Sequence, residues 1–146
     1  MYNKAKEAMN KTKIGSFIGG VQEEIIVKAE KKLDVVFPVS YKNFLKDYGV
    51  GRIGNEEILG ITKNNQGWPS VIWNTIEERN FGQMPKELVP VYLYDDEFYF
   101  CLDTSKFKDG ECPIVAVNIG DAGGERKKTY DSFGALLFEI VKTVIE

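Results

Sequence analysis

Histidine is absent from the 146-residue chain, and its main candidates for chemistry are two cysteines and 22 aspartates and glutamates. Without an imidazole the chain can form neither a Ser-His-Asp triad nor a Cys-His pair. It also lacks the commonest general base near neutral pH. Two cysteines are too few for a four-thiolate zinc site. The sequence therefore predicts a protein with no metal site and no cofactor.

The two cysteines lie in surroundings that disfavour a reactive thiolate. Cys101 belongs to an apolar, aromatic segment, and Cys112 has Asp109 and Glu111 as neighbours. A nucleophilic thiol needs a nearby cation or a helix N-terminus to lower its pKa. We expect both thiols to be packed or idle.

Carboxylates alone can carry out acid–base chemistry, as two of them do in glycosidases. The acidic residues fall in adjacent groups, and nothing in their spacing selects one pair as catalytic. A carboxylate-dependent hydrolase is an alternative, but the sequence favours a protein that is not an enzyme. The groups are Glu23-Glu24, Glu56-Glu57, Glu77-Glu78 and Asp95-Asp96-Glu97.

Residues 49–54 read Gly-Val-Gly-Arg-Ile-Gly, which matches the letters of the dinucleotide-binding GxGxxG motif. That motif requires a strand before it and a helix after it, so that pyrophosphate meets a helix N-terminus. Here a predicted helix precedes the glycines and a predicted strand follows them. We interpret the glycines as a helix stop and a tight turn.

The charge is unevenly distributed along the chain. The net charge is −3, but residues 1–13 carry four lysines and one glutamate, so residues 14–146 carry −6. Residues 95–111 alone hold six acidic side chains against two lysines. Nucleic-acid binding requires clustered lysine and arginine, so we expect no nucleic-acid ligand. A basic partner protein suits this charge, although surplus acid also keeps a small domain soluble.

The spacing of apolar residues indicates an α+β protein. Helices are predicted from Val21, after Pro38, after Ser70 and after Asp131 or Ser132, each with an apolar stripe. Strands are predicted near 58–61, 88–94, 97–102 and 113–117, and the glycine-rich stretch 120–128 is predicted to be a loop. Helices at both ends with adjacent strands between them imply a single domain with a largely antiparallel sheet.

No segment of the sequence looks suited to a membrane. A membrane helix needs about 20 apolar residues, and no apolar run approaches that length. The lysines at the start are not followed by the apolar region of a signal peptide. We expect a cytoplasmic protein with no membrane partner, and the oligomeric state stays open.

An ordered set of motifs resembles the SUKH superfamily, the group that includes the fungal cell-wall-assembly regulators. The resemblance covers about residues 20–145 and rests on the order of the motifs rather than on any one of them. Its positions are Glu23, Glu24, Glu30, Leu33, Pro38, Tyr41, Phe44, Leu45, Gly49, Gly51, Leu59, Gly60, Thr75, Arg79, Leu88-Val89-Pro90-Val91, Cys101–Thr104 and Gly110–Val115.

The resemblance implies an α+β domain without an active site. Bacterial members look like immunity proteins that bind and neutralise a cognate secreted toxin, frequently a nuclease. We therefore expect stoichiometric, non-catalytic inhibition of a basic toxin domain; a general protein-binding scaffold or regulatory module is the alternative. The SUKH-like domain would span residues 20–146, after an N-terminal extension, residues 1–19, that forms a helix or a loosely packed arm.

The resemblance transfers no binding residue, because partner specificity in such a family resides in variable surface positions. From charge and exposed aromatic character we predict the acidic turn Asp95, Asp96 and Glu97 as the centre of the partner-binding surface. Glu77, Glu78 and Trp68 complete the predicted surface.

Overall fold

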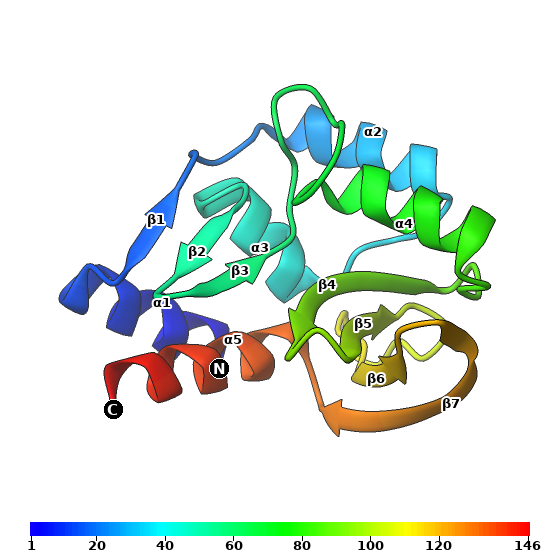
Figure 1. Ribbon diagram of the computed structural model, residues 1–146. Helices are drawn as coiled ribbons and strands as arrows, with labels where there is room; N and C mark the ends of the chain where they lie inside the picture. The colour runs from blue at the N-terminus through cyan, green and yellow to red at the C-terminus, as the bar shows by residue number, and fades with distance from the viewer.

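The computed structural model describes residues 1–146 as a seven-stranded antiparallel sheet with five helices around it (Figure 1). The strands follow one another across the sheet in chain order, from β1 to β7. The first and last helices pack against each other, and both contribute to the main hydrophobic core. The predicted α+β class, with an antiparallel sheet and helices at both ends, is confirmed.

The sheet has two halves that are joined narrowly. The first half is made of three-residue strands, and the second half of longer ones. The register of β3 with β4 has one residue pair, Ile58 with Tyr92, and the Leu59 amide donates to the Val91 carbonyl at 2.9 Å. The strands are β1 (Gly15–Phe17), β2 (Gly51–Ile53), β3 (Glu56–Ile58), β4 (Leu88–Tyr94), β5 (Phe98–Asp103), β6 (Ile114–Asn118) and β7 (Asp121–Tyr130).

The helices cover the sheet in two groups. Two of them, α2 and α4, run side by side along one side of the molecule, whereas α1 packs against α5 (Figure 1). Between them lies a main hydrophobic cluster of 27 buried residues. The helices are α1 (Tyr2–Thr12), α2 (Glu23–Leu33), α3 (Val39–Asp47), α4 (Val71–Phe81) and α5 (Phe133–Ile145).

Helix starts and stops lie where local chemistry places them. Ser70 Oγ accepts a hydrogen bond from the Trp73 amide at 3.1 Å, and Ser132 Oγ accepts one from the Ala135 amide at 3.1 Å. Such bonds satisfy amides that have no partner within the helix. Gly49 follows α3 with φ of 77°, a conformation that glycine adopts without strain. The predicted helix stop and turn in residues 49–54 are confirmed.

One element was predicted wrongly. Residues 120–128 were expected to form a loop, but β7 runs through them and pairs with β6 as the edge strand. The stretch has no alternation of apolar and polar residues because most of its side chains are exposed on both faces. An edge strand of this kind leaves little hydrophobic pattern to detect.

The N-terminal residues contribute to the core. Tyr2, Ala5 and Met9 of α1 are buried in the main cluster, and the Tyr2 hydroxyl donates a hydrogen bond to Asp47 Oδ2 at 2.6 Å. The division into an extension, residues 1–19, and a domain, residues 20–146, stays a prediction.

Candidate protein-binding surface

Strands β4 to β7 form a sheet with one covered face and one face that is open only toward the β4–β5 turn. At the other end of this second face, Leu102 and Ile114 are buried in the main cluster. We call the accessible part the open face. Successive side chains of a strand point to opposite faces. On β5, Tyr99 and Cys101 are buried, while Phe98 and Phe100 remain partly exposed on the other face. The Tyr99 hydroxyl donates a hydrogen bond to Glu78 Oε2 of α4 at 2.8 Å. Helix α4 therefore lies over the covered face.

The open face carries a cluster of aromatic rings. Tyr94 and Phe100 stack with their centroids 5.6 Å apart and their planes at 18°. Tyr92 meets Phe100 edge-on at 5.6 Å, and Tyr130 of β7 lies 6.2 Å from Phe100. The side chain of Tyr94 is 50% exposed. Aromatic side chains that stay accessible in this way are the usual anchors of protein interfaces.

The aromatic cluster borders two hollows that meet at Tyr94 and Phe100. One hollow, of about 340 Å³, is floored by Ala116, whose small side chain stands directly opposite Phe100 in the strand register. The other, of about 620 Å³, lies between the sheet and the Ile140 and Val144 side of α5. Together they form a groove along the open face, which we call the aromatic groove.

The charge around the aromatic groove is predominantly negative. Glu56 and Glu139 line the hollow beside α5, and no lysine or arginine lines it. Glu125 and Lys127 line the other hollow. The turn that follows Tyr94 adds three exposed acidic side chains, so the open face is complementary to a positively charged surface. These are Asp95, Asp96 and Glu97.

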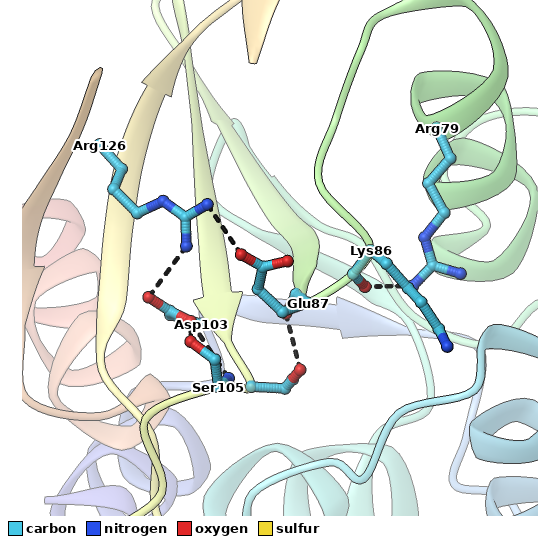
Figure 2. Close-up of polar contacts among 7 residues, drawn as sticks. Arg79, Lys86, Glu87, Asp103, Ser105 and Arg126 are labelled. Carbon is cyan, nitrogen blue, oxygen red and sulfur yellow. Dashed lines mark hydrogen bonds and ion pairs between the residues drawn. The ribbon is translucent and has the colours of Figure 1, made fainter. Parts of the chain in front are cut away.

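The covered face contains a polar network that is structural (Figure 2). Arg126 of β7 donates to Asp103 Oδ2 at 3.3 Å and to Glu87 Oε2 at 2.9 Å. The Asp103 side chain is fully buried, and its other oxygen accepts a hydrogen bond from Ser105 Oγ at 2.6 Å. Nearby, Arg79 donates to the Lys86 carbonyl at 2.7 Å. Figure 2 shows how these contacts tie β5, β7 and the segment before β4 together.

The thiols are placed for packing. Burial raises the pKa of the Cys101 thiol well above its ordinary value, and burial with the nearby Glu111 charge raises that of Cys112 to about 12. Both are free and buried. No three His, Cys, Asp or Glu side chains are arranged to hold a metal ion. No helix has the length and apolar character needed to cross a bilayer.

Comparison with known proteins places the chain in a family. Residues 1–142 match the family model described as SUKH_5, SMI1-KNR4 cell-wall. The chain belongs to the SUKH family. A solved structure described as a protein from Pseudomonas syringae pv. tomato is similar, with a TM-score of 0.63 and 18% sequence identity. The similarity covers 91% of this chain and 92% of that one, and it supports the fold alone.

The predicted binding residues of this SUKH domain fall in three places. Asp95 and Asp96 form the β4–β5 turn in left-handed conformations with φ of 55° and 53°, next to Tyr94. Glu97 completes this exposed turn at the end of the aromatic groove.

Glu77 and Glu78 lie instead on α4, where Glu78 is bonded to Tyr99 on the covered face. Trp68 is 40% exposed in the segment between β3 and α4, and its indole nitrogen donates to Glu57. The structure therefore places only the acidic turn beside the aromatic groove. Contact of any of the six with a partner stays a prediction.

Sequence reasoning missed the aromatic groove itself. A signal was present: in Tyr92-Leu93-Tyr94 and Phe98-Tyr99-Phe100, aromatic residues recur at every second position on both sides of the turn. Alternation of this kind indicates one strand face rich in aromatic rings. It does not say whether another element covers that face, because α5 comes from a distant part of the SUKH sequence.

Proposed function

We propose that this SUKH protein is an immunity protein that binds a basic bacterial toxin domain through its aromatic groove. Neutralisation is stoichiometric and non-catalytic, since binding alone covers the toxin's working surface. The observation that carries the proposal is the partly exposed aromatic cluster of β4, β5 and β7, with Tyr94 half exposed and an acidic rim.

The chemistry of the aromatic groove supports a protein partner. Exposed rings such as Tyr94 bury a large area on binding and lose little rotamer entropy. The hollows on either side of Tyr94 give a partner side chain a place to insert. A surface that provides anchors and pockets in one place is suited to a specific complex.

The charge of the groove supports a nuclease as the partner. Nucleases carry lysine and arginine where they bind phosphate. Carboxylates of an inhibitor can occupy that surface in place of the nucleic acid. The acidic turn and the groove carboxylates offer such groups, and an inhibitor of an intracellular nuclease would act in the cytoplasm.

The family supports a binding role, because the SUKH family is generally non-enzymatic and has immunity or regulatory members. The description of the family, SMI1-KNR4 cell-wall, favours a second candidate function, a general protein-binding scaffold or regulatory module. The two differ in stoichiometry. An immunity protein holds one toxin tightly, whereas a scaffold holds several host proteins weakly.

The test starts with capture of partners from a lysate of the source organism at moderate salt. Any basic protein retained is then produced separately, and its cleavage of DNA or RNA is titrated with the SUKH chain. We expect complete inhibition at one equivalent. Residual activity at a clear excess of the SUKH chain would contradict the immunity role, and several weakly held host proteins would favour the scaffold.

Matched variants locate the interface. We expect Tyr94→Ala and Phe98→Ala each to weaken the complex about tenfold or more, because interface aromatics are common hot spots. Phe81→Ala is the control, since Phe81 is 80% exposed at the end of α4, away from the groove. Wild-type affinity in both groove variants, with melting temperatures unchanged, would place the interface elsewhere.

A further inference from the structure

The hollow beside α5 has the construction of a cation cage. Its walls include the rings of Tyr92, Tyr94, Phe100 and Tyr130. Neighbouring centroids in this set lie 5.6 to 6.4 Å apart, so the rings form one continuous aromatic surface. The faces of aromatic rings attract cations, and the attraction strengthens where water is partly excluded.

Two carboxylates complete the hollow. Glu56 accepts a hydrogen bond from the Tyr92 hydroxyl, and Glu139 lies on the α5 side. Tyr130 and Glu139 both line the hollow, and burial and then the Glu139 charge raise the pKa of the Tyr130 phenol. The hollow therefore gathers phenol oxygens and carboxylates on one side of the sheet.

No cation of the chain itself fills this space. Lysine and arginine are absent from the twelve residues that line the hollow. Lys142 pairs with Glu139 at 3.6 Å but lies over the Phe138 ring, outside the lining. The negative charge of the hollow is thus only partly offset from its outer edge.

We propose that this cage binds the guanidinium of an arginine side chain that projects from the partner protein. The inference rests on the proposed function, because the arginine belongs to the protein bound by the aromatic groove. A guanidinium is planar and weakly hydrated, so it stacks on rings and bonds carboxylates at the same time. A lysine ammonium is more strongly hydrated and fits such a slot less well.

The experiment uses the full chain and short peptides, so it needs no partner protein. Acetyl-Gly-Arg-Gly-amide is titrated into the isotope-labelled protein, and the ring signals of Tyr94, Phe100 and Tyr130 are followed by NMR. We expect saturable shifts confined to these rings and their neighbours. The same peptide with citrulline, the neutral isostere of arginine, should bind at least about tenfold more weakly.

Three results would overturn the inference: ring signals that do not move, arginine and citrulline peptides that bind equally, or a lysine peptide that binds as tightly as arginine. A matched set of amide variants tests the carboxylates. Glu139→Gln and Glu56→Gln should each weaken arginine binding about threefold or more. Glu24→Gln, at an exposed position of α2 outside the groove, should leave it within twofold.

Failure of the cage and failure of the proposed function can be distinguished. If Phe98→Ala weakens a toxin complex while the arginine peptide fails to bind, the cage is wrong and the immunity role stands. If the peptide binds but no captured protein is inhibited, the immunity role is wrong and the cation site stands. Melting temperatures of each variant show whether a lost effect reflects lost folding.

Discussion

The two faces of the β4–β7 sheet are built from alternate residues of the same strands, yet they serve different ends. On the covered face, Tyr99 packs in the smaller hydrophobic cluster and donates a hydrogen bond to Glu78 of α4. On the open face, Phe100 meets other rings and a hollow. The difference teaches that aromatic content alone does not mark a core. A covering element makes one face part of the core and leaves part of the other face accessible to solvent.

The largest expected contrast is in thiol accessibility. Ala116→Cys places a thiol on the open face, whereas Cys101 is buried on the covered one. We expect the new thiol to react with a disulfide reagent about a thousandfold faster or more, because Cys101 must wait for unfolding. Timed labelling and peptide mapping at pH 8 measure both sites in one sample. Comparable rates would mean that the covered face opens readily.

Truncation of a packed side chain should separate the faces in stability. Leu88→Ala on the covered face should lower the free energy of unfolding by about 2–5 kcal/mol, because it leaves a cavity. Tyr94→Ala on the open face should cost less than about 1 kcal/mol, because Tyr94 is half exposed. Urea denaturation followed by circular dichroism compares them. Equal losses would show that the open face is part of the core.

Adjacent residues of β7 offer a comparison within one strand. Arg126→Met leaves the buried Asp103 carboxylate without its cation and should cost about 2 kcal/mol, less than a fully buried pair because Arg126 is partly exposed. Lys127→Met on the open face should stay within about 0.5 kcal/mol. The same urea titration applies. A neutral Arg126→Met would show that Ser105 and solvent suffice for Asp103.

Neutralising the acidic turn should act on the rate of association. The triple change Asp95→Asn, Asp96→Asn, Glu97→Gln removes three charges, and asparagine tolerates the left-handed backbone at the first two. We expect association with a basic toxin to slow about three- to tenfold at low salt, with dissociation little changed. Surface plasmon resonance at two ionic strengths measures this. An effect confined to dissociation would argue for direct, desolvated contacts instead.

The smallest expected effect is the loss of stability at acid pH that comes from Glu87. A hydrogen bond from its own backbone amide, then the Arg126 contact, hold the pKa of Glu87 below its ordinary value of 4.5. The stability this gives is complete above pH 4.5 and is lost as pH falls through the lower folded value. The wild-type protein should therefore have a higher urea midpoint than the Glu87→Gln variant at pH 7, and this difference should become smaller at pH 3. A constant difference would contradict this linkage.

Much of the fold could be predicted because it rests on local signals. Ser70 and Ser132 cap helices through their own side chains, and Gly49 ends α3 through its backbone. The order of strands follows the order of the chain, so neighbours in sequence became neighbours in the sheet. Signals of this kind need no knowledge of distant residues.

The candidate binding surface was harder to predict, because it depends on which parts of a sheet face are left uncovered by helices. The acidic turn was visible as charge, and it does lie beside Tyr94. Glu78 carried the same kind of charge but is engaged by Tyr99 across the covered face. Only the packing of α4 and α5 decides which carboxylates face a partner, and that packing is set by residues far apart in the sequence.

The charges of β7 also bear on how the protein behaves at high concentration. Its outer edge carries no further strand of the sheet, and unpaired edges of this length invite aggregation. Glu125, Arg126, Lys127 and Lys128 follow one another along it. A strand added by another copy would crowd these charged side chains and remove part of their hydration. The polar residues of β7, which left no apolar pattern in the sequence, thus disfavour edge-to-edge aggregation of the folded protein.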